Sequence, residues 1–306
     1  MIVSVRAAVR AWYGPRRRAY AWRRRPTPYR VLVSEVMLQQ TQTPRVDRPF
    51  RTFVRRFPSV RSLAAASRAE VLRAWAGLGY NRRAVNLHEA ARTIVLEHGG
   101  RVPASVEALR RLPGVGPYTA AAVASIAFGA PAAAVDVNVE RISSRFHLGV
   151  EPHQLSRAEV RRLADGWLDR DHPGDWNQAL MDIGREHCRP VPRCVGCPLA
   201  LDCSFRKGGR GPGREGMATR RDGPAPRRPS SGQPRFEGSF RQVRGAVVAA
   251  LRDRERITLR GLVEATGHDA DRVVAAVAAL AEEGMVAAGP AALAGRPAGR
   301  VRLGTD

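Results

Sequence analysis

The sequence predicts a mainly α-helical protein with a small C-terminal α/β module, and three observations support this prediction. First, strand-like alternation is scarce up to about residue 205, and apolar residues recur there at helical spacing, as in 31–38, 71–75, 85–94 and 120–127. Second, short breaks such as Gly99-Gly100 and Pro113-Gly114 separate these helical segments. Third, the composition changes abruptly after residue 204. We therefore expect a helical domain over residues 1–204 and a separate part beyond it.

The residues after 204 divide into two segments of different character. Residues 205–234 are rich in Gly, Pro, Ser and Arg, which is typical of a flexible basic linker. Residues 235–306 again show apolar periodicity, with helices expected near 240–251, 259–265 and 269–283. Two extended pieces at 285–287 and 300–303 could pair as a hairpin, so the module has the layout of a winged helix.

The charge of the chain favours an acidic partner. Its 306 residues are enough for a large buried core, and 51 Lys+Arg against 28 Asp+Glu leave a formal charge of +23. Nine arginines and no acidic residue occur in the first thirty positions, and residues 204–234 carry eight basic and two acidic residues. Nucleic acid or an anionic membrane surface would match such a chain.

Membrane and secretory classes are disfavoured by the hydrophobic pattern. The N-terminus has no apolar core followed by a cleavage site, and Pro and Gly interrupt the longest uncharged stretch, 112–135. We therefore expect a cytoplasmic protein. If its acidic partner is DNA, we expect a monomer that associates with the nucleoid.

Four cysteines lie within sixteen residues and predict a metal-containing site. Their spacing is Cys188-x5-Cys194-x2-Cys197-x5-Cys203, and no cysteine lies elsewhere. Four thiolates in a short irregular loop favour one [4Fe-4S] cluster. A structural zinc site is the alternative, although zinc sites more often pair two CxxC-like knuckles across a longer loop. Unligated cysteines are a third reading.

Two further motifs point to a DNA-binding enzyme. The stretch 112–120 places a Gly-x-Gly turn, Gly114 to Gly116, before a helix, where backbone N–H groups could hold a DNA phosphate. Asp136 follows about twenty residues later, at the end of an apolar Gly/Pro loop. A hairpin, such a loop and an aspartate in this order resemble the helix-hairpin-helix DNA glycosylase superfamily.

Within that superfamily, several runs resemble the adenine DNA glycosylases (the MutY family). These runs are PYRVLVSEVMLQQTQ at 28–42, WAGLGY at 75–80, NLH at 86–88 and NQALMDIG at 177–184. The resemblance covers residues 5–204 and implies a two-lobed helix-hairpin-helix fold with an iron–sulfur loop. It also implies removal of adenine mispaired with 8-oxoguanine or guanine in double-stranded DNA, after the base is flipped out.

The resemblance assigns expected roles to four residues near the chemistry. Glu35 matches the general acid that protonates N7 of adenine, and its apolar neighbours would raise its pKa. Asp136 matches the carboxylate that stabilises an oxocarbenium-like sugar cation. Asn138 would support Asp136, and Tyr118 takes the hairpin position of a Schiff-base lysine in bifunctional relatives. A single Glu or Asp is otherwise more often part of a solvated helix face.

Other positions carry over to DNA and substrate contacts. The resemblance aligns Arg18, Trp22 and Gln178 with an adenine pocket. Gln40 and Tyr80 align with side chains that wedge into the base stack, and Gln42 closes the same motif. The alternative for Trp22 and Tyr80 is ordinary core packing, because buried aromatic residues usually pack.

The scarcity of lysine limits the chemistry. Lys207 is the only lysine, so no lysine Schiff base is available in the expected catalytic domain. We therefore expect a monofunctional glycosylase that leaves the abasic site uncut.

The chain also departs from the family pattern. The first cysteine interval has five residues instead of six, Val137 replaces the usual Gly or Thr, and Asn81 replaces a second Tyr. Residues 235–306 do not resemble the Nudix-like domain that recognises 8-oxoguanine in longer members. We hypothesise that the linker supplies phosphate affinity and that the module docks on DNA or on the catalytic domain.

Two other functions compete with adenine removal. A glycosylase for thymine or uracil opposite guanine is compatible with Tyr118, whereas Glu35 in its motif favours adenine. A non-enzymatic iron–sulfur regulator that binds DNA would not need Glu35 and Asp136.

Overall fold

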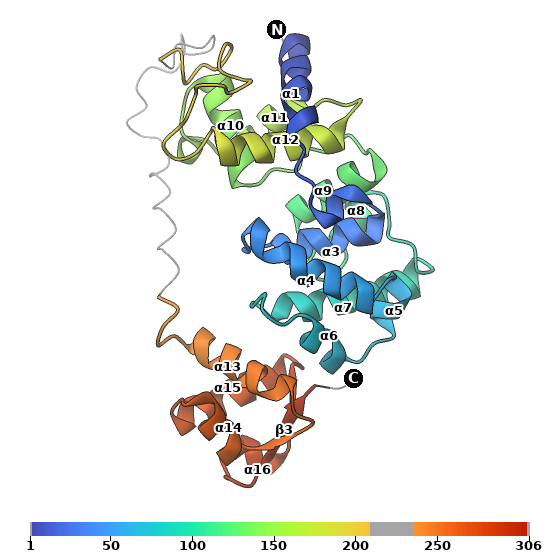
Figure 1. Cartoon of the computed structure of the whole chain (residues 1–306), viewed down its shortest axis with the longest axis vertical. Helices are drawn as coiled ribbons and strands as arrows, with labels where there is room; N and C mark the ends of the chain where they lie inside the picture. The colour runs from blue at the N-terminus through green and yellow to red at the C-terminus, as the bar shows by residue number, and fades with distance from the viewer. Residues whose placement is uncertain (1, 209–234, 305–306) are drawn as a thin grey trace. The chain divides into compact units, whose positions relative to one another are not determined.

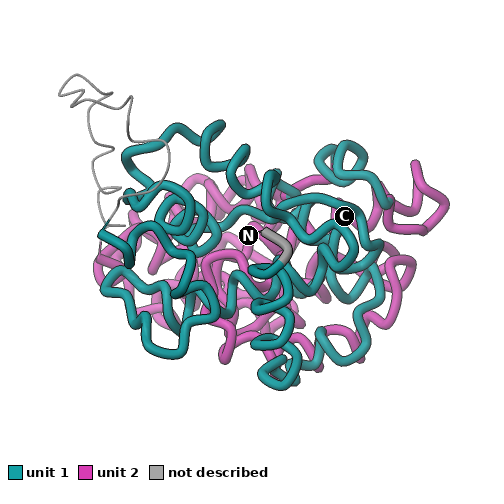
Figure 2. Tube along the Cα trace, turned by 90° about the horizontal axis from the view of Figure 1, so that it is seen from above, with its two compact units in different colours: residues 1–35, 104–111, 115–230 teal, residues 36–103, 112–114, 231–306 magenta. Residues whose placement is uncertain are grey.

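The computed structural model describes residues 2–208 and 235–304, which fall into two compact units (Figures 1 and 2). Unit 1 comprises 1–35, 104–111 and 115–230, and unit 2 comprises 36–103, 112–114 and 231–306. Each unit therefore combines segments that are far apart in the sequence. Residues 209–234, which make up most of the expected linker 205–234, lie outside the described residues.

The described part of unit 1 contains helices and connecting loops but no strand. Its elements are α1 (Ile2–Arg16), α2 (Ala21–Arg24), most of α3 (Pro28–Leu38), α8 (Val106–Arg110), α9 (Pro117–Phe128), α10 (Val137–Leu148), the 3-10 turn η1 (Pro152–Gln154), α11 (Arg157–Trp167) and α12 (Pro173–Glu186). Helix α12 packs against α1, α9 and α10, which makes it the centre of the unit. The core is aromatic: Trp167 meets Trp176 edge-to-face at 5.2 Å and stacks on Phe146 at 4.8 Å.

Unit 2 contains a helical part and the C-terminal module. The helical part consists of α4 (Thr43–Arg56), α5 (Val60–Ala64), α6 (Arg68–Ala74) and α7 (Arg82–Glu97). Serine capping boxes begin α5 at Ser59 and α6 at Ser67, because each serine accepts from a backbone N–H of the first turn. Phe53 and Trp75 pack edge-to-face at 5.8 Å in the core of this part.

The module confirms the expected small α/β arrangement. It contains α13 (Phe240–Arg252), β1 (Ile257–Thr258), α14 (Leu259–Thr266), α15 (Ala270–Glu282), β2 (Val286–Ala288), α16 (Pro290–Leu293) and β3 (Arg300–Leu303). The predicted hairpin is present, with β2 antiparallel to β3. The short strand β1 pairs with the other edge of β3, which gives the sheet order β1-β3-β2. The apolar stripe of α15, exemplified by Val273 and Val277, is fully buried.

No helix among the described residues has the length and apolar character needed to cross a membrane.

Candidate active site

Glu35 is a buried carboxyl on α3. Only 5% of its surface is exposed, and the preceding residues Val31, Leu32 and Val33 are at most 2% exposed. Burial raises the pKa of Glu35 to about 7, and the negative charge of Asp136 adds to this rise. A hydrogen bond from Tyr118 and the positive charge of Arg23 oppose it. The side chain is therefore present in both protonation states near neutral pH.

Tyr118, in the first turn of α9, lies directly against Glu35. Its hydroxyl donates to Glu35 Oε2 at 3.0 Å and is 3.5 Å from Met181 Sδ. Burial and the two nearby carboxyl groups hold the pKa of Tyr118 well above its usual range. The hydroxyl therefore stays protonated and can donate to Glu35. The structure thus brings together two of the four residues expected at the chemical centre.

Asp136 caps the N-terminus of α10. Its Oδ1 accepts from the backbone N–H groups of Asn138 and Val139 at 2.9 and 2.8 Å, and its Oδ2 accepts from Asn138 Nδ2 at 2.8 Å. Donors of this kind, together with the positive end of the helix, suit an anionic carboxylate. Val137, which departs from the family pattern, is 68% exposed, and its carbonyl accepts from Arg141 at 3.2 Å.

A close helix contact holds Asn138 in place. A Cβ on Gly184 of α12 would lie 2.5 Å from Asn138 Cβ, so only glycine permits this approach. Arg141 donates to Asn138 Oδ1 at 2.8 Å and to the carbonyls of Gly184 and Cys188. The Asp136 network is thereby connected to the beginning of the cysteine loop.

The expected adenine-pocket residues all lie in unit 1, and each has local contacts. Trp22 is buried and stacks on Tyr20 with ring centroids 4.7 Å apart. Arg18 pairs with Glu186 at 2.8 Å. Gln178 is 5% exposed and donates to the Gly174 carbonyl within its own helix.

Arg23 is a largely buried cation that the sequence did not single out. Its guanidinium makes a two-pronged contact to Asp182, at 2.8 and 3.3 Å, with both side chains at most 10% exposed. Among nine arginines in thirty residues, charge alone does not show which one is buried. The one sequence signal for Arg23 is its position directly after Trp22.

Gln40 and Tyr80, the two expected wedge residues, lie in unit 2 and share an unusual backbone. They are the non-glycine residues with positive φ in the described chain, at 54° and 46°. For such residues this conformation is strained by roughly 1–3 kcal/mol. Tyr80 is 42% exposed, and Gln40 is exposed. Gln42 is exposed at the N-cap of α4 and makes no capping side-chain bond.

Arg83, another residue that the sequence did not single out, fixes both wedge positions. Its NH1 donates to the carbonyls of Val36, Met37 and Gln39, and its NH2 to those of Leu78 and Gly79. Its guanidinium carbon also lies 5.5 Å from the centre of the Tyr80 ring. Burial lowers the pKa of Arg83 to about 10, so the group remains charged at neutral pH.

The hairpin before α9 has the expected form. Gly114 has φ +73°, and a Cβ there would lie 2.6 Å from Asn86 Cβ, so the turn requires glycine. Gly116 is the N-cap of α9 and Pro117 is its first residue. No side chain caps this helix start, and its backbone N–H groups can bind an anion.

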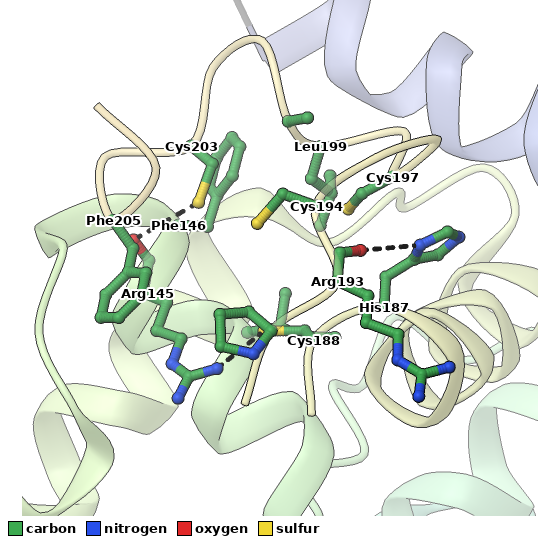
Figure 3. A pocket seen from close by; sticks show the side chains of 13 residues that line it. Arg145, Phe146, His187, Cys188, Arg193, Cys194, Cys197, Leu199, Cys203 and Phe205 are labelled. Carbon is green, nitrogen blue, oxygen red and sulfur yellow. Dashed lines mark hydrogen bonds between the residues drawn. The ribbon is translucent and has the colours of Figure 1, made fainter. Parts of the chain in front are cut away.

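The four cysteines line one pocket beside α10 (Figure 3). Within residues 2–208 and 235–304, no three His, Cys, Asp or Glu side chains converge closely enough to hold a single metal ion. Burial raises the pKa of Cys197 to about 11 and also raises that of Cys188, so a cluster or metal would have to displace protons from these thiols.

Arg145 shapes the shortened first cysteine interval. Its guanidinium lies 3.7 Å from Cys188 Sγ (Figure 3). It also donates to the carbonyls of Arg189 and Pro190 at 2.6 and 2.9 Å. The loop is closed by the Arg193 N–H, which donates to the His187 carbonyl at 2.8 Å. These bonds show how five residues suffice between the first two cysteines.

Comparison with known proteins agrees with this fold. Residues 33–167 match the family described as HhH-GPD superfamily base excision DNA repair protein. A thermostable thymine-DNA glycosylase has a similar structure, with TM-score 0.61 and 30% identity over 66% of this chain and 94% of that one. An endonuclease III in a non-covalent DNA complex gives TM-score 0.57 at 25% identity, over 68% and 97% of the two chains. The class is therefore the helix-hairpin-helix base excision glycosylases.

Sequence relatives narrow the class. The adenine DNA glycosylase of Mycobacterium tuberculosis is 40% identical over 80% of this chain and 77% of its own length. That of Mycolicibacterium smegmatis is 38% identical over 79% and 78%. The human one is 41% identical over 67% of this chain, a region that is 40% of the human protein. The chain thus belongs to the adenine DNA glycosylases, a family of N-glycosyl hydrolases.

Replacing the buried carboxyl should make stability less dependent on pH. The raised pKa of Glu35 means that its neutral form is favoured on folding, so stability is lost as pH rises from about 4.5 to about 7. We expect Glu35→Gln to have the same free energy of unfolding as wild type at pH 4.5. At pH 8 we expect its free energy of unfolding to exceed that of wild type by about 3 kcal/mol. Denaturant unfolding at both pH values measures this, with exposed Glu97→Gln as control. An equal difference at both pH values would contradict it.

The contact between α10 and α12 should not tolerate a methyl group. Gly184→Ala is expected to lower the free energy of unfolding by about 1–3 kcal/mol and to slow base excision at least about 10-fold, because Asn138 must move away from Asp136. Gly166→Ala is the matched control, since nothing lies within 4 Å of its Cβ position and it should be neutral or stabilising. Equal behaviour of the two variants would refute the constraint.

Proposed function

We propose that this chain excises adenine mispaired with 8-oxoguanine or guanine from double-stranded DNA. The observation that carries the proposal is the buried carboxyl of Glu35. Because its pKa is raised to about 7, this carboxyl can donate a proton near neutral pH. A base inside a duplex is inaccessible to such a buried group, so the target nucleotide must be flipped out of the stack. Once the base is flipped, Glu35 protonates N7 of adenine and makes the base a better leaving group.

Asp136 is the second catalytic group in this proposal. Three N–H donors and the N-terminus of α10 hold its carboxylate in place to stabilise the oxocarbenium-like sugar cation. The two roles support each other, because the charge of Asp136 raises the pKa of Glu35 and keeps its proton available. Asn138 positions Asp136, and Tyr118 orients the Glu35 carboxyl through its hydrogen bond.

The other expected residues fit DNA and substrate binding. Arg18, Trp22 and Gln178 line the adenine pocket in this proposal, and Gln40, Gln42 and Tyr80 contact the base stack. The exposed aromatic ring of Tyr80 on a rigid turn is suited to stacking. The uncapped start of α9, from Gly114 to Gly116, binds a phosphate.

A [4Fe-4S] cluster held by Cys188, Cys194, Cys197 and Cys203 is part of the proposal. Four thiols around one pocket, without convergence on a single point, suit a multi-atom cluster better than one zinc ion. When bound, the cluster supplies a rigid brace for the loop. The Cys188 carbonyl in that loop accepts from Arg141, which in turn holds Asn138.

The chain is monofunctional in this proposal, with a catalytic domain over 1–204 and a separate module over 235–306. Tyr118 cannot form a Schiff base, and Lys207 is the only lysine. The chain acts as a monomer on DNA in the cytoplasm.

The main test is an excision panel with the full chain. Duplexes carrying A, T or U opposite guanine or 8-oxoguanine are incubated, treated with alkali and examined for strand breaks. We expect breaks only for adenine, only after alkali, and at a rate that falls as pH rises above about 7, because Glu35 loses its proton. Glu35→Gln should be inactive, and borohydride should trap no covalent adduct.

Other outcomes of the panel identify the competing functions. Excision of thymine or uracil would favour the pyrimidine glycosylase, to which the structural similarity with a thymine-DNA glycosylase points. DNA binding without excision of any base would favour a regulator. Borohydride trapping in high yield would contradict monofunctional chemistry.

The metal content tests the cysteine site. The purified chain should contain about four iron and four sulfide per molecule, as one [4Fe-4S] cluster requires. Cys194→Ala should lose most of the iron and lower thermal stability, because the loop loses its brace. Stoichiometric zinc, or full activity of a metal-free chain, would contradict the proposal.

A further inference from the structure

Asn177 is a buried amide on α12 that has no role in the proposed chemistry. Only 1% of its surface is exposed. Its Oδ1 accepts from the Ala134 N–H at 3.1 Å, and its Nδ2 donates to Ser125 Oγ and to the Ala132 carbonyl, each at 2.9 Å. Loss of this amide would leave several buried polar groups without a partner, which is costly.

The segment that Asn177 holds leads directly to Asp136. Residues 129–135 connect α9 to the N-cap of α10 without regular structure. Ala134 is fully buried, and within the part of the chain that the structure describes its N–H has no backbone acceptor. The Asn177 side chain therefore satisfies this buried N–H. Asp136 follows two residues later, so at most about 7 Å of chain separates the two positions.

The partners of Asn177 fix the orientation of its amide. A backbone N–H can only donate and a carbonyl can only accept, so Oδ1 must face Ala134 and Nδ2 must face Ala132. Ser125 Oγ accepts from Asn177 and donates to the Ala122 carbonyl at 3.3 Å. The loop before Asp136 is thereby tied both to α12 and to the last turn of α9.

Asn177 belongs to one face of α12 that also contacts other groups near the chemistry. Residues at i+3 and i+4 spacing form this face: Gly174, Asn177, Met181 and Gly184. A Cβ on Gly174 would lie 2.9 Å from the Ser125 carbonyl oxygen, so α9 and α12 approach closely beside Asn177. Met181 Sδ lies 3.5 Å from the Tyr118 hydroxyl, which donates to Glu35. The same helix face therefore supports the surroundings of both carboxyl groups.

We propose that Asn177 is a positioning residue for Asp136, because it holds the loop before α10 and so determines where the Asp136 carboxylate lies relative to Glu35. The inference rests on the proposed function for the catalytic role of Asp136. Asn177 bonds to the backbone of the loop and acts on the carboxylate through two residues of chain. The N-cap bonds of Asp136 orient its carboxylate on α10, whereas Asn177 fixes the chain that leads into that helix.

Asn177→Ala in the full chain should impair chemistry without impairing DNA binding. We expect its single-turnover excision rate to fall roughly 10- to 100-fold, since a displacement of about 1 Å can cost that much. Its affinity for a duplex carrying 2′-fluoro-2′-deoxyadenosine, which resists hydrolysis, should equal that of wild type. Asp169→Ala is the matched control, because Asp169 is equally buried but bonds to Arg10 and to the Asp171 N–H. That variant should lose thermal stability and keep the wild-type rate.

The pH dependence of the rate separates positioning from a general loss of stability. The negative charge of Asp136 raises the pKa of Glu35, whereas Tyr118 and Arg23 lower it. With Asp136 displaced, Glu35 should lose its proton at lower pH, so the decline in rate should begin at lower pH in Asn177→Ala than in wild type. The control should decline with the wild-type profile. Equal rates and equal pH profiles for the two variants would refute the proposal.

Amide hydrogen exchange gives a readout that is independent of activity. Peptides covering residues 129–136 should exchange faster in Asn177→Ala and at the wild-type rate in Asp169→Ala. Unchanged exchange in Asn177→Ala would contradict the proposed anchoring. If Asn177→Ala does not fold, Ser125→Ala, which removes one acceptor of the Asn177 amide, decides the question by the same measurements. It should show the same changes to a smaller extent, and wild-type behaviour would overturn the proposal.

Failure of this inference is distinguishable from failure of the proposed function. A chain that excises thymine or uracil would reject adenine as the substrate, and the variants are then measured with that base. A chain that excises no base would reject the proposed function, together with the catalytic part of the inference. Adenine excision at equal rates in wild type and Asn177→Ala would reject only the positioning role.

Discussion

The burial of an ionisable carboxyl at Glu35 is the constraint on which unit 1 depends. Burial among apolar residues of α3 removes water from this carboxyl and raises its pKa. The surrounding polar residues limit that rise, so that the pKa of Glu35 is about 7. Tyr118 donates to it and Arg23 lowers its pKa, while Asp136 raises it. Arg23 is itself paired with Asp182. Without Asp182, the positive charge of Arg23 would lower the pKa of Glu35 further. Asp182 therefore helps to keep the Glu35 carboxyl protonated.

The second constraint is the close approach of α10 and α12. Asp136 is the N-cap of α10, Gly184 lies next to Asn138 in the last turn of α12, and the cysteine loop begins just after that helix. Arg141 bridges these parts through the Asn138 side chain and the Cys188 carbonyl. Two side chains, Arg141 and Asn138, therefore connect the Cys188 carbonyl of the cysteine loop to the Asp136 carboxylate. This arrangement gives the loop an effect on the site although no cysteine lies among the reacting groups.

Much of the fold was predictable, because long helices impose a strong apolar period and short Gly/Pro breaks mark their ends. Strand β1 and helix α16 were not predicted, since two and four residues are too short to show a period. The carboxylates and cysteines were recognisable from motifs and spacing. Arg23, Arg83 and Arg145 were not, because the sequence does not show which of its many arginines are buried. Backbone carbonyls, which have no sequence signature, accept from Arg83, and they accept from Arg145 together with the Glu151 carboxylate.

The left-handed backbone at Gln40 and Tyr80 has a consequence for how the chain would search DNA. Arg83 secures the turns around both residues through the carbonyls of Gln39 and Gly79. The free energy cost of the strained backbone at Gln40 and Tyr80 is therefore already included in the free energy of folding. If Gln40 and Tyr80 contact the base stack as proposed, a chain that slides along a duplex would test each base pair with a rigid probe. The rate of inspection would then depend on the deformability of the DNA rather than on loop rearrangement.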